Sequence, residues 1–192
     1  MERRLCRPDT TRDTLGASRC IQMKTTFKIS QALLSSIRQD LHRAHPFAFE
    51  RVGFIACRAA YTADGLIIMA YDYEPVPDDE YLRDSHAGAM MGSDAIRRGM
   101  NLALNRGEED VSVFHVHQHY GEGIPLFSST DTRETAKFVP DFFHAAQKMP
   151  HGALILSDDR ATGRLWLAED AIPLPLDRIM SVGMRTEFLH IP

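Results

Sequence analysis

Three of the nine histidines of this 192-residue chain lie close together, in Phe114-His-Val-His-Gln-His119. The residues before them, Val111 to Phe114, are mostly β-branched or aromatic, which predicts a strand that leads into the cluster. Side chains alternate along a strand, so His115, His117 and His119 share one face. Imidazole is a good zinc ligand, and the end of this strand is therefore predicted to offer two nitrogens to one metal ion.

A third ligand is expected from the segment that follows the strand. Residues 120–127 include two glycines and one proline, which predicts a loop, and Ser128-Ser-Thr-Asp131 has the pattern of a helix N-terminus. If this loop folds back, the carboxylate of Asp131 lies beside the strand end. A capping box with Ser128 is a purely structural role for the same residue. The joint presence of these features favours a metal site.

The order of these features resembles the JAMM motif of the JAB/MPN metallo-isopeptidases, in which His-x-His, a loop and Ser-x-x-Asp follow one another. The family also has an upstream glutamate, and Phe49-Glu50-Arg-Val-Gly-Phe-Ile-Ala56 matches it: a glutamate leads into an apolar strand with a glycine three residues later. The resemblance covers roughly residues 24–170. It is closest in type to the compact bacterial JAB proteins.

The resemblance implies a role for each matching residue. His115, His117 and Asp131 would hold Zn2+, with a water in the fourth position. Glu50 would take a proton from that water and deliver it to the leaving amine as general acid and base. Ser128 would donate its hydroxyl to the oxyanion of the tetrahedral intermediate. The structural alternatives are a solvated residue before a strand for Glu50 and a helix N-cap for Ser128, with Ser129 able to cap instead.

The choice of the histidine pair stays open at this level. The family usually has ten residues between its second histidine and the aspartate; thirteen separate His117 from Asp131 and eleven separate His119 from it. Spacing therefore favours His117 with His119. The family's first histidine follows an aromatic residue, as His115 follows Phe114, and the loop glycines suit an insertion. We predict His115 and His117 as the pair, although Gln118 stands where the family has proline.

The rest of the chain predicts an α/β fold, or α+β in layers, with a central mixed β-sheet flanked by helices. The resemblance implies the JAB/MPN (cytidine-deaminase-like) version of it. Residues 74–90 are predicted to be a long loop, and residues 172–192 are predicted to be irregular at first and then to pack apolar side chains. Periodicity and turn residues predict helices at 30–44, 93–107 and 128–139, strands at 51–57, 66–71, 111–115, 152–156 and 164–167, and hairpin turns at 63–65 and 158–163.

Composition describes one ordinary globular domain and excludes several partners. The net charge is −4 and 44% of residues are hydrophobic, with no basic block to bind nucleic acid and no apolar run long enough to span a membrane. Residues 1–22 are polar and predicted to be a disordered leader, which leaves 23–192 as a single domain. Three cysteines without a Cys-x-x-Cys pattern fit a reducing cytoplasm.

The resemblance implies hydrolysis of an isopeptide or peptide bond after the C-terminal glycine of a ubiquitin-like protein, either in deconjugation or in precursor processing. Its partners would be that protein or its conjugate, together with enzymes of a bacterial conjugation pathway, in some cases one of phage defence. The substrate tail would add as a strand to a sheet edge. In the long loop, Tyr73, Tyr81, Met90 and Met91 are candidates for contacts with the partner, and packing of the loop is the alternative.

Four other interpretations are weighed against this one. A non-catalytic MPN-like scaffold would bind partners without zinc. A cupin would use His115, His117 and Glu122 as ligands, but the glycine and histidine elements of its motifs are missing and helices do not suit an all-β barrel. A zinc deaminase would need a Cys-x-x-Cys after the histidine. Cys57 as a nucleophile is disfavoured, because a thiol within an apolar strand is usually inert.

Overall fold

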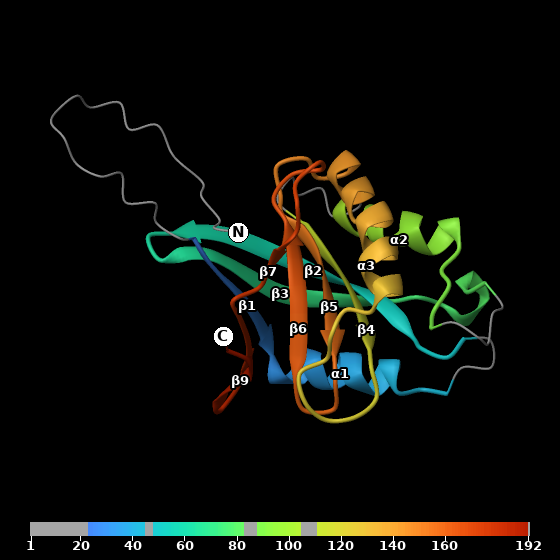
Figure 1. The fold of residues 1–192 in the computed structure, drawn as a ribbon, viewed down its shortest axis with the longest axis horizontal. Coiled ribbons are helices and arrows are strands. Elements are labelled where there is room, and N and C mark those ends of the chain that lie inside the picture. The colour runs from blue at the N-terminus through green and yellow to red at the C-terminus, as the bar shows by residue number, and fades with distance from the viewer. Residues whose placement is uncertain (1–22, 45–47, 83–87, 105–110, 192) are drawn as a thin grey trace, which may run out of the picture.

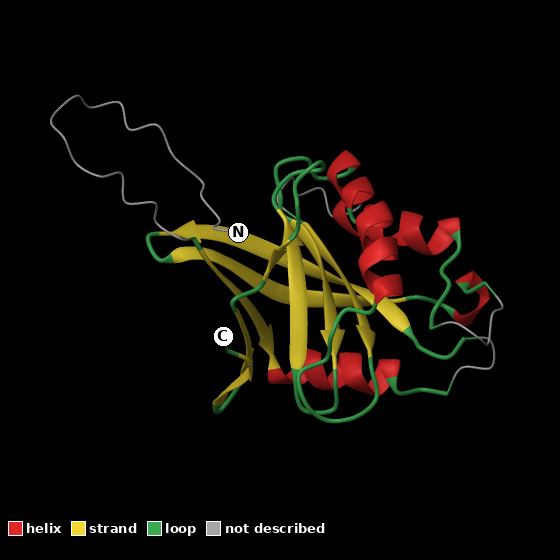
Figure 2. Cartoon of the chain, in the orientation of Figure 1, coloured by secondary structure: helices red, strands yellow, loops and turns green. Residues whose placement is uncertain are grey.

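The computed structural model describes residues 23–44, 48–82, 88–104 and 111–191. Nine strands form one mixed sheet in the order β7-β6-β5-β4-β2-β3-β1-β8-β9 (Figures 1 and 2). The elements, of which η1 and η2 are short 3-10 helices, are β1 (Lys24–Ser30), α1 (Gln31–Leu41), β2 (Val52–Thr62), β3 (Gly65–Pro75), η1 (Asp78–Glu80), α2 (Ser93–Leu104), β4 (Ser112–Gln118), α3 (Ser129–Phe138), η2 (Pro140–His144), β5 (His151–Leu156), β6 (Ala161–Trp166), β7 (Leu174–Pro175), β8 (Arg178–Val182) and β9 (Thr186–His190).

The sheet separates two hydrophobic cores. On one face α2, α3 and η2 pack on the inward side chains of β2 and β4, such as Phe54 and Val113. On the other face Leu34, Ile37 and Leu41 of α1 pack against residues that include Phe114. Figure 1 shows α1 on the opposite side of the sheet from α2 and α3. The alternation expected for β4 is confirmed, since its even-numbered apolar residues face α1 and its odd-numbered residues face α2 and α3.

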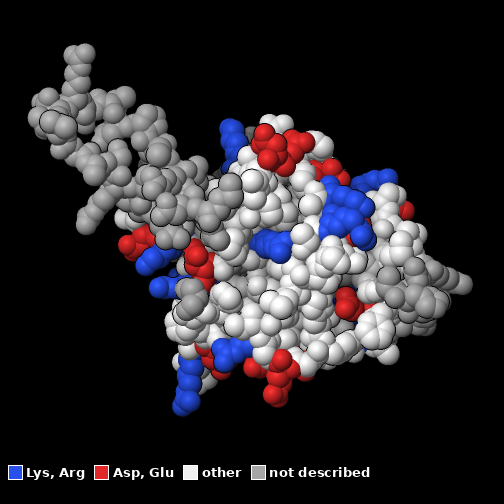
Figure 3. Space-filling view, in the orientation of Figure 1, with Lys and Arg blue, Asp and Glu red and all other residues white. Residues whose placement is uncertain are grey.

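The sheet is curled, so that β9 at one edge comes into contact with β6 near the other edge. The guanidinium of Arg160 donates to the carbonyl of Phe188 at 3.3 Å across this approach. The face drawn in Figure 3 carries both signs of charge in separate small groups, without a continuous basic surface. Among the described residues, none of the helices combines the length and the apolar content needed to cross a bilayer.

The predicted architecture of a mixed sheet with flanking helices is confirmed, and the helices exclude the all-β cupin alternative. Several boundaries differ from the prediction. The first helix ends at Leu41. Strand β2 continues into the hairpin as far as Thr62, and β3 continues beyond its predicted end to Pro75. The segment after 172 forms β7, β8 and β9 and buries Leu176, Ile179 and Leu189. The predicted leader at 1–22 and the predicted helix stop at Gly107 lie outside the described residues.

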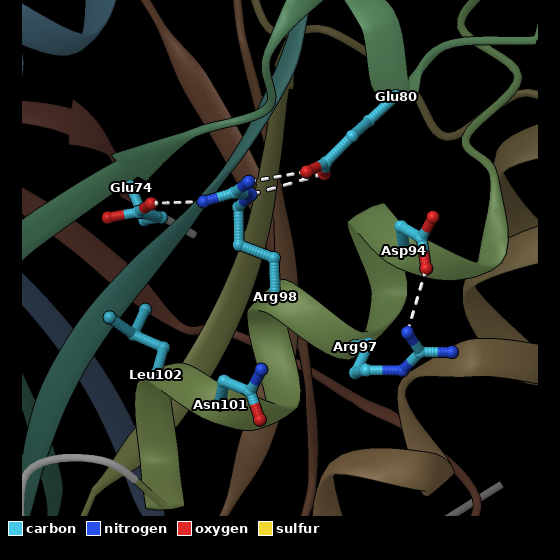
Figure 4. Close-up of a pocket in the computed structure, with 7 residues that line it drawn as sticks. All are labelled: Glu74, Glu80, Asp94, Arg97, Arg98, Asn101 and Leu102. Carbon is cyan, nitrogen blue, oxygen red and sulfur yellow. Dashed lines mark hydrogen bonds and ion pairs between the residues drawn. The ribbon is translucent and has the colours of Figure 1, made fainter.

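Arg98 on α2 lies at the centre of an ion-pair group that ties the helix to β3 and η1. Its Nη1 donates to Glu74 at 2.8 Å, while Nε and Nη2 both bind the carboxylate of Glu80 (Figure 4). These contacts raise the pKa of Arg98, with the bond to Glu80 the largest cause. Among the described residues, the neighbouring Arg97 pairs with Asp94 alone, one helical turn away. The hollow that these residues line is therefore occupied by its own ion pairs.

We expect Arg98→Ala to lower the free energy of unfolding by about 1–2 kcal/mol, because it leaves two half-buried carboxylates without their shared cation. Arg97→Ala, which breaks a pair that is well exposed on both sides, should change it by less than about 0.5 kcal/mol. Urea denaturation of both variants measures the difference. Equal losses in the two variants would show that the group around Arg98 is no more than ordinary surface charge.

His151 begins β5 and is fully buried. Its Nδ1 accepts a hydrogen bond from the backbone N–H of Val113 at 3.0 Å, and its Nε2 lies 3.0 Å from the carbonyl oxygen of Ala146, to which it donates. Both contacts are satisfied only by the neutral ring. Burial lowers the pKa of His151 to about 4, although the two hydrogen bonds oppose this.

The lowered pKa of His151 makes the folding stability depend on pH. The unfolded ring takes up a proton near pH 6.5, whereas the folded ring stays neutral down to about pH 4. The stabilisation is complete above pH 6.5 and is lost as the pH falls through this window, by about 3 kcal/mol in total. The variant His151→Gln keeps a donor and an acceptor but does not titrate. The difference in free energy of unfolding between wild type and this variant should therefore become smaller as the pH falls from 7 to 4. Parallel denaturation curves for the two proteins over this range would contradict the assignment.

Candidate metal centre

The register of β2 against β4 brings Glu50 to the histidine cluster. Val52 pairs with His117 in this antiparallel ladder. Two residues before Val52 and two residues after His117 stand Glu50 and His119, which therefore project from the same face of the sheet. A carboxylate oxygen of Glu50 and one ring nitrogen each of His117 and His119 lie within 4.8 Å of one another. Glu50 and His117, which are 67 positions apart along the chain, thus lie close together.

Asp131 approaches the same histidines from α3. Ser128 is the N-cap of this helix: its Oγ accepts from the N–H of Asp131 at 3.0 Å, and its own N–H donates to Asp131 Oδ2 at 2.7 Å. This is the capping box that the sequence predicts, and the cap is Ser128 rather than Ser129. The box also fixes the Asp131 side chain, so that its oxygens lie 3.4 Å from His117 Nε2 and 3.5 Å from His119 Nε2.

The nearest-atom separations within this group are in the range of ligands that share one metal ion. The Nε2 atoms of His117 and His119 are 3.2 Å apart, and Asp131 approaches His117 with Oδ1 at 3.4 Å and His119 with its other oxygen, Oδ2, at 3.5 Å. The group in which one ligand atom of each residue lies within 4.8 Å of the others is Glu50, His117 and His119. Tetrahedral coordination with bonds of 2.0–2.1 Å places neighbouring ligand atoms about 3.3 Å apart. Two imidazoles and one carboxylate form a donor set that zinc accepts, and three protein ligands leave one position open. The group therefore fits a catalytic type of zinc site.

Exposure increases across the group. The side chain of His117 is 4% exposed, that of Asp131 is 14% exposed and that of His119 is 28% exposed. Burial by itself would raise the pKa of Asp131, but the contact with His117 and the hydrogen bonds from Ser128 outweigh it and hold this pKa well below the ordinary range. Asp131 is therefore an anion at neutral pH, as a metal ligand has to be.

Glu50 is partly buried and is held on both flanks. The N–H of Phe49 donates to the carbonyl of Gly88 at 3.0 Å, and a Cβ at Gly88 would lie 3.1 Å from Glu50 Oε2. On the other side the buried guanidinium of Arg51 donates to Asp78 at 2.6 Å. Burial raises the pKa of the Glu50 carboxyl, and the two nearby histidines oppose this shift. A raised pKa brings this carboxyl closer to the working range of an acid–base group than that of an exposed glutamate.

The segment around Glu50 is also tied to the long loop. The buried hydroxyl of Tyr81 accepts from the N–H of Val52 at 2.8 Å and donates to the carbonyl of the same residue at 3.2 Å. Tyr73 packs its ring on Gly53, where a Cβ would overlap it at 2.4 Å, and donates to Asp40 at 2.7 Å. Tyr73 and Tyr81 therefore pack the protein, which is the alternative that the sequence left open for them, and their contact with a partner stays a prediction.

The loop between β4 and α3 is fastened to the turn between β5 and β6. Asp158 accepts from the N–H of Gly121 at 3.1 Å and from the side chain of Gln118 at 3.0 Å. Asp159 accepts from the N–H of Gly123 at 2.7 Å. Both glycines have positive φ, of 109° and 93°, which other residues rarely adopt. These hydrogen bonds fix the path of the loop from His119 to Asp131.

His115 does not join the group. Its ring lies between Phe54 and Phe138, with centroids 5.9 and 5.0 Å away, and neither of its nitrogens has a hydrogen-bond partner within the described part of the chain. Burial lowers the pKa of His115 well below its ordinary value. The structure brings together His117 and His119, the pair that spacing favours, in place of the predicted pair His115 and His117. The physical reason is that His115 points into the core beneath α3, three residues before β4 ends at Gln118.

Other residues considered from the sequence lie elsewhere. Glu122 is exposed at the tip of the loop and is not one of the clustered groups. Cys57 is fully buried, and burial raises the pKa of its thiol, so it is not an activated nucleophile. Ser128 is exposed at the edge of the centre, and its hydroxyl hydrogen is not used by the capping bond that its oxygen accepts.

Comparisons with known proteins give little beyond these observations. No protein-family model matches the chain, and no curated protein sequence matches it significantly. Among solved structures, the Trichoplax adhaerens STIL N-terminal domain is similar at 9% sequence identity with a TM-score of 0.35. The match covers 71% of this chain and 40% of that one, so this chain spans less than half of that structure's length. A likeness this distant carries no argument about function.

We expect the purified protein, stripped with a chelator and titrated with Zn2+, to bind one ion. His119→Ala and Asp131→Ala should each weaken binding by about a hundredfold or more, because even loss of a residue that only supports a ligand costs tenfold to a hundredfold. His115→Phe and Glu122→Ala are the controls and should bind zinc as wild type does. Normal zinc binding by His119→Ala, together with loss of binding in His115→Phe, would show that His115 and His117 are the ligands.

Proposed function

We propose that this protein is a zinc-dependent peptidase or isopeptidase of the JAMM type, which cleaves the bond after the C-terminus of a ubiquitin-like protein. The observation that carries this proposal is the convergence of two histidines and two carboxylates: Glu50 clusters with His117 and His119, and Asp131 lies 3.4 and 3.5 Å from the same two rings. In this assignment the two histidines and the aspartate hold the metal, and Glu50 does not.

Zinc held in such a site lowers the pKa of a coordinated water to about 7 and polarises a carbonyl oxygen. The role of Glu50 is to take the proton of the attacking water and pass it to the leaving amine. Its partial burial and raised pKa support this role, because an acid–base group works best when its pKa lies near the working pH. Its placement opposite His119 puts it at the exposed side of the centre.

Ser128 is assigned to the oxyanion of the tetrahedral intermediate. Its oxygen accepts the N–H of Asp131, which orients the hydroxyl and leaves its hydrogen available for donation. A fixed donor that points to developing negative charge contributes to catalysis without reorganisation during the reaction. The N-cap role and the catalytic role are therefore compatible in the same side chain.

The order of elements supports the JAB/MPN (cytidine-deaminase-like) architecture in particular. A glutamate precedes β2, the two histidines end β4, and Ser-x-x-Asp begins α3. Two departures from the family pattern remain: the residue after His119 is Tyr120 instead of proline, and the loop is one residue longer than usual. The bonds of Asp158 and Asp159 to this loop give a physical reason why it holds its shape without the proline.

A polypeptide substrate is supported by apolar side chains exposed near the ends of the ligand-bearing segments. Phe49 directly precedes Glu50 and is 66% exposed, and Leu126 lies two residues before Ser128 and is 78% exposed. Met90, close to Gly88 in sequence, is also exposed. Isolated exposed apolar residues are common, but several beside one reactive centre are typical of a surface that binds another chain. The partners proposed from this are a ubiquitin-like protein or its conjugate and the enzymes of its pathway.

We expect the zinc-loaded protein to cleave a ubiquitin-like fusion and Glu50→Gln to lower kcat by about 10²- to 10⁴-fold, since the amide cannot carry the proton. Zinc content should be unchanged in this variant, because Glu50 is not a ligand. Glu122→Gln, an exposed acid in the adjacent loop, should remain as active as wild type.

Two outcomes would contradict the proposal. Equal cleavage by wild type and Glu50→Gln would show that Glu50 is not the acid–base group. Stoichiometric zinc with no cleavage of any ubiquitin-like fusion would favour a binding scaffold over an enzyme.

A further inference from the structure

Arg164 on β6 lies on the same face of the sheet as the candidate metal centre. In the ladders of β4, β5 and β6, His115 pairs with Ala153, and Ala153 pairs with Arg164. Residues paired across neighbouring strands project from the same face, which here is the face under α2 and α3. The guanidinium therefore rises toward α3, the helix that carries Asp131.

Arg164 contacts one residue before the N-cap of α3 and one residue in its first turn. Its Nη1 donates to Thr132 Oγ1 at 3.1 Å, and Thr132 directly follows Asp131. Its Cζ lies 4.3 Å from the ring centroid of Phe127, which directly precedes Ser128. The guanidinium therefore borders the segment that holds both the proposed ligand Asp131 and the proposed oxyanion donor Ser128.

Arg164 has no carboxylate partner among the described residues. A guanidinium offers five N–H donors, and within the described part of the chain Arg164 uses one of them, on a neutral hydroxyl. Among the described residues, no carboxylate lies within ion-pair distance of it, in contrast to Arg133 on the same helix end, which pairs with Glu134 at 2.8 Å. Arg164 is half-buried, and burial lowers its pKa, partly offset by the charge of Asp131. A guanidinium that meets no carboxylate here keeps its other N–H donors available for a ligand.

We propose that Arg164 is a specificity residue that binds a carboxylate of the polypeptide substrate close to the scissile bond. The planar fork of a guanidinium matches a carboxylate with two parallel hydrogen bonds, and stacking on Phe127 fixes the plane of the fork in advance. The carboxylate belongs to an Asp or Glu side chain or to a chain terminus. This inference rests on the proposed function, because it assumes that a polypeptide crosses the N-terminus of α3.

The alternative is that Arg164 only holds α3 in place through Thr132. Arg164→Gln distinguishes the two roles, because glutamine retains a donor for Thr132 and can pack on Phe127 but carries no charge. Arg133→Ala is the matched control, since it removes a nearby guanidinium that already has its own carboxylate. Zinc content of each variant reports whether the N-terminus of α3 still holds Asp131 in position.

The test uses three fluorescent peptides of equal length with Gly-Gly at the centre: one with a Glu after it and an amidated C-terminus, one with Gln in place of Glu, and one with Gln and a free C-terminal carboxylate. Binding to zinc-loaded Glu50→Gln protein is measured by fluorescence anisotropy, and cleavage is measured with the protein that has Glu50. Wild type at position 164 should favour one carboxylate peptide over the uncharged peptide by about tenfold or more in both assays. The carboxylate peptide that is preferred identifies the source.

Arg164→Gln should remove this preference and leave zinc content and the uncharged peptide unaffected, whereas Arg133→Ala should retain the preference. A preference that persists in Arg164→Gln, an equal loss for all three peptides, or no binding of any peptide overturns the inference. Carboxylate-dependent binding through Arg164 without cleavage would instead contradict the proposed function alone. Cleavage that does not distinguish the peptides would leave that function standing and reject the role of Arg164.

Discussion

The antiparallel pairing of β2 with β4 brings Glu50 to His117 and His119, the centre of the candidate site. With Val52 opposite His117, the residue that precedes β2 and the residue that follows β4 project together from the face covered by α3. A slip of one residue in this ladder would turn His117 and His119 toward the core around α1 and separate them from Glu50 and Asp131. The ladder is protected from such a slip because β4 is fully buried between β2 and β5, and because Gly53 has room for no side chain beneath Tyr73.

The buried polar side chains at this strand end lower the stability of the fold. Both ring nitrogens of His115 and Nδ1 of His117 are buried without hydrogen bonds inside the described regions, and each such atom typically costs about 1–3 kcal/mol. Phe54 and Phe138 pack on His115, and Phe142 packs on both of these rings, which provides apolar contacts that offset this cost. A ligating histidine normally donates its second nitrogen to a partner, so the surroundings of His117 depart from the usual support of a metal site.

Local patterns in the sequence were sufficient for the mixed sheet, for the shared face of the histidines and for the capping box at Ser128, because alternation and capping depend on neighbouring residues. The structure groups His117 with His119, whereas the prediction paired His115 with His117. The aromatic residue Phe114 suggested His115, but only the three-dimensional structure shows that His115 is still inside the sheet, whereas the spacing to Asp131 already favoured His119. Strands β8 and β9 were missed because β8 pairs with β1, some 150 residues earlier in the chain. Arg164 had no local signal at all, since its position follows from the registers of three ladders.

The three proposed ligands differ in exposure, so the centre is open to solvent on one side. His117 is enclosed by protein, Asp131 is held at its second oxygen by the helix it begins, and His119 stands on the open side next to Glu50. An ion that exchanged with solvent would therefore pass His119, and this ligand would be the last to bind and the first to release. A chelator approaching the protein would meet the same side chain. The rate of metal loss, as distinct from the affinity, would therefore be governed by the one proposed ligand that follows the strand rather than lying within it.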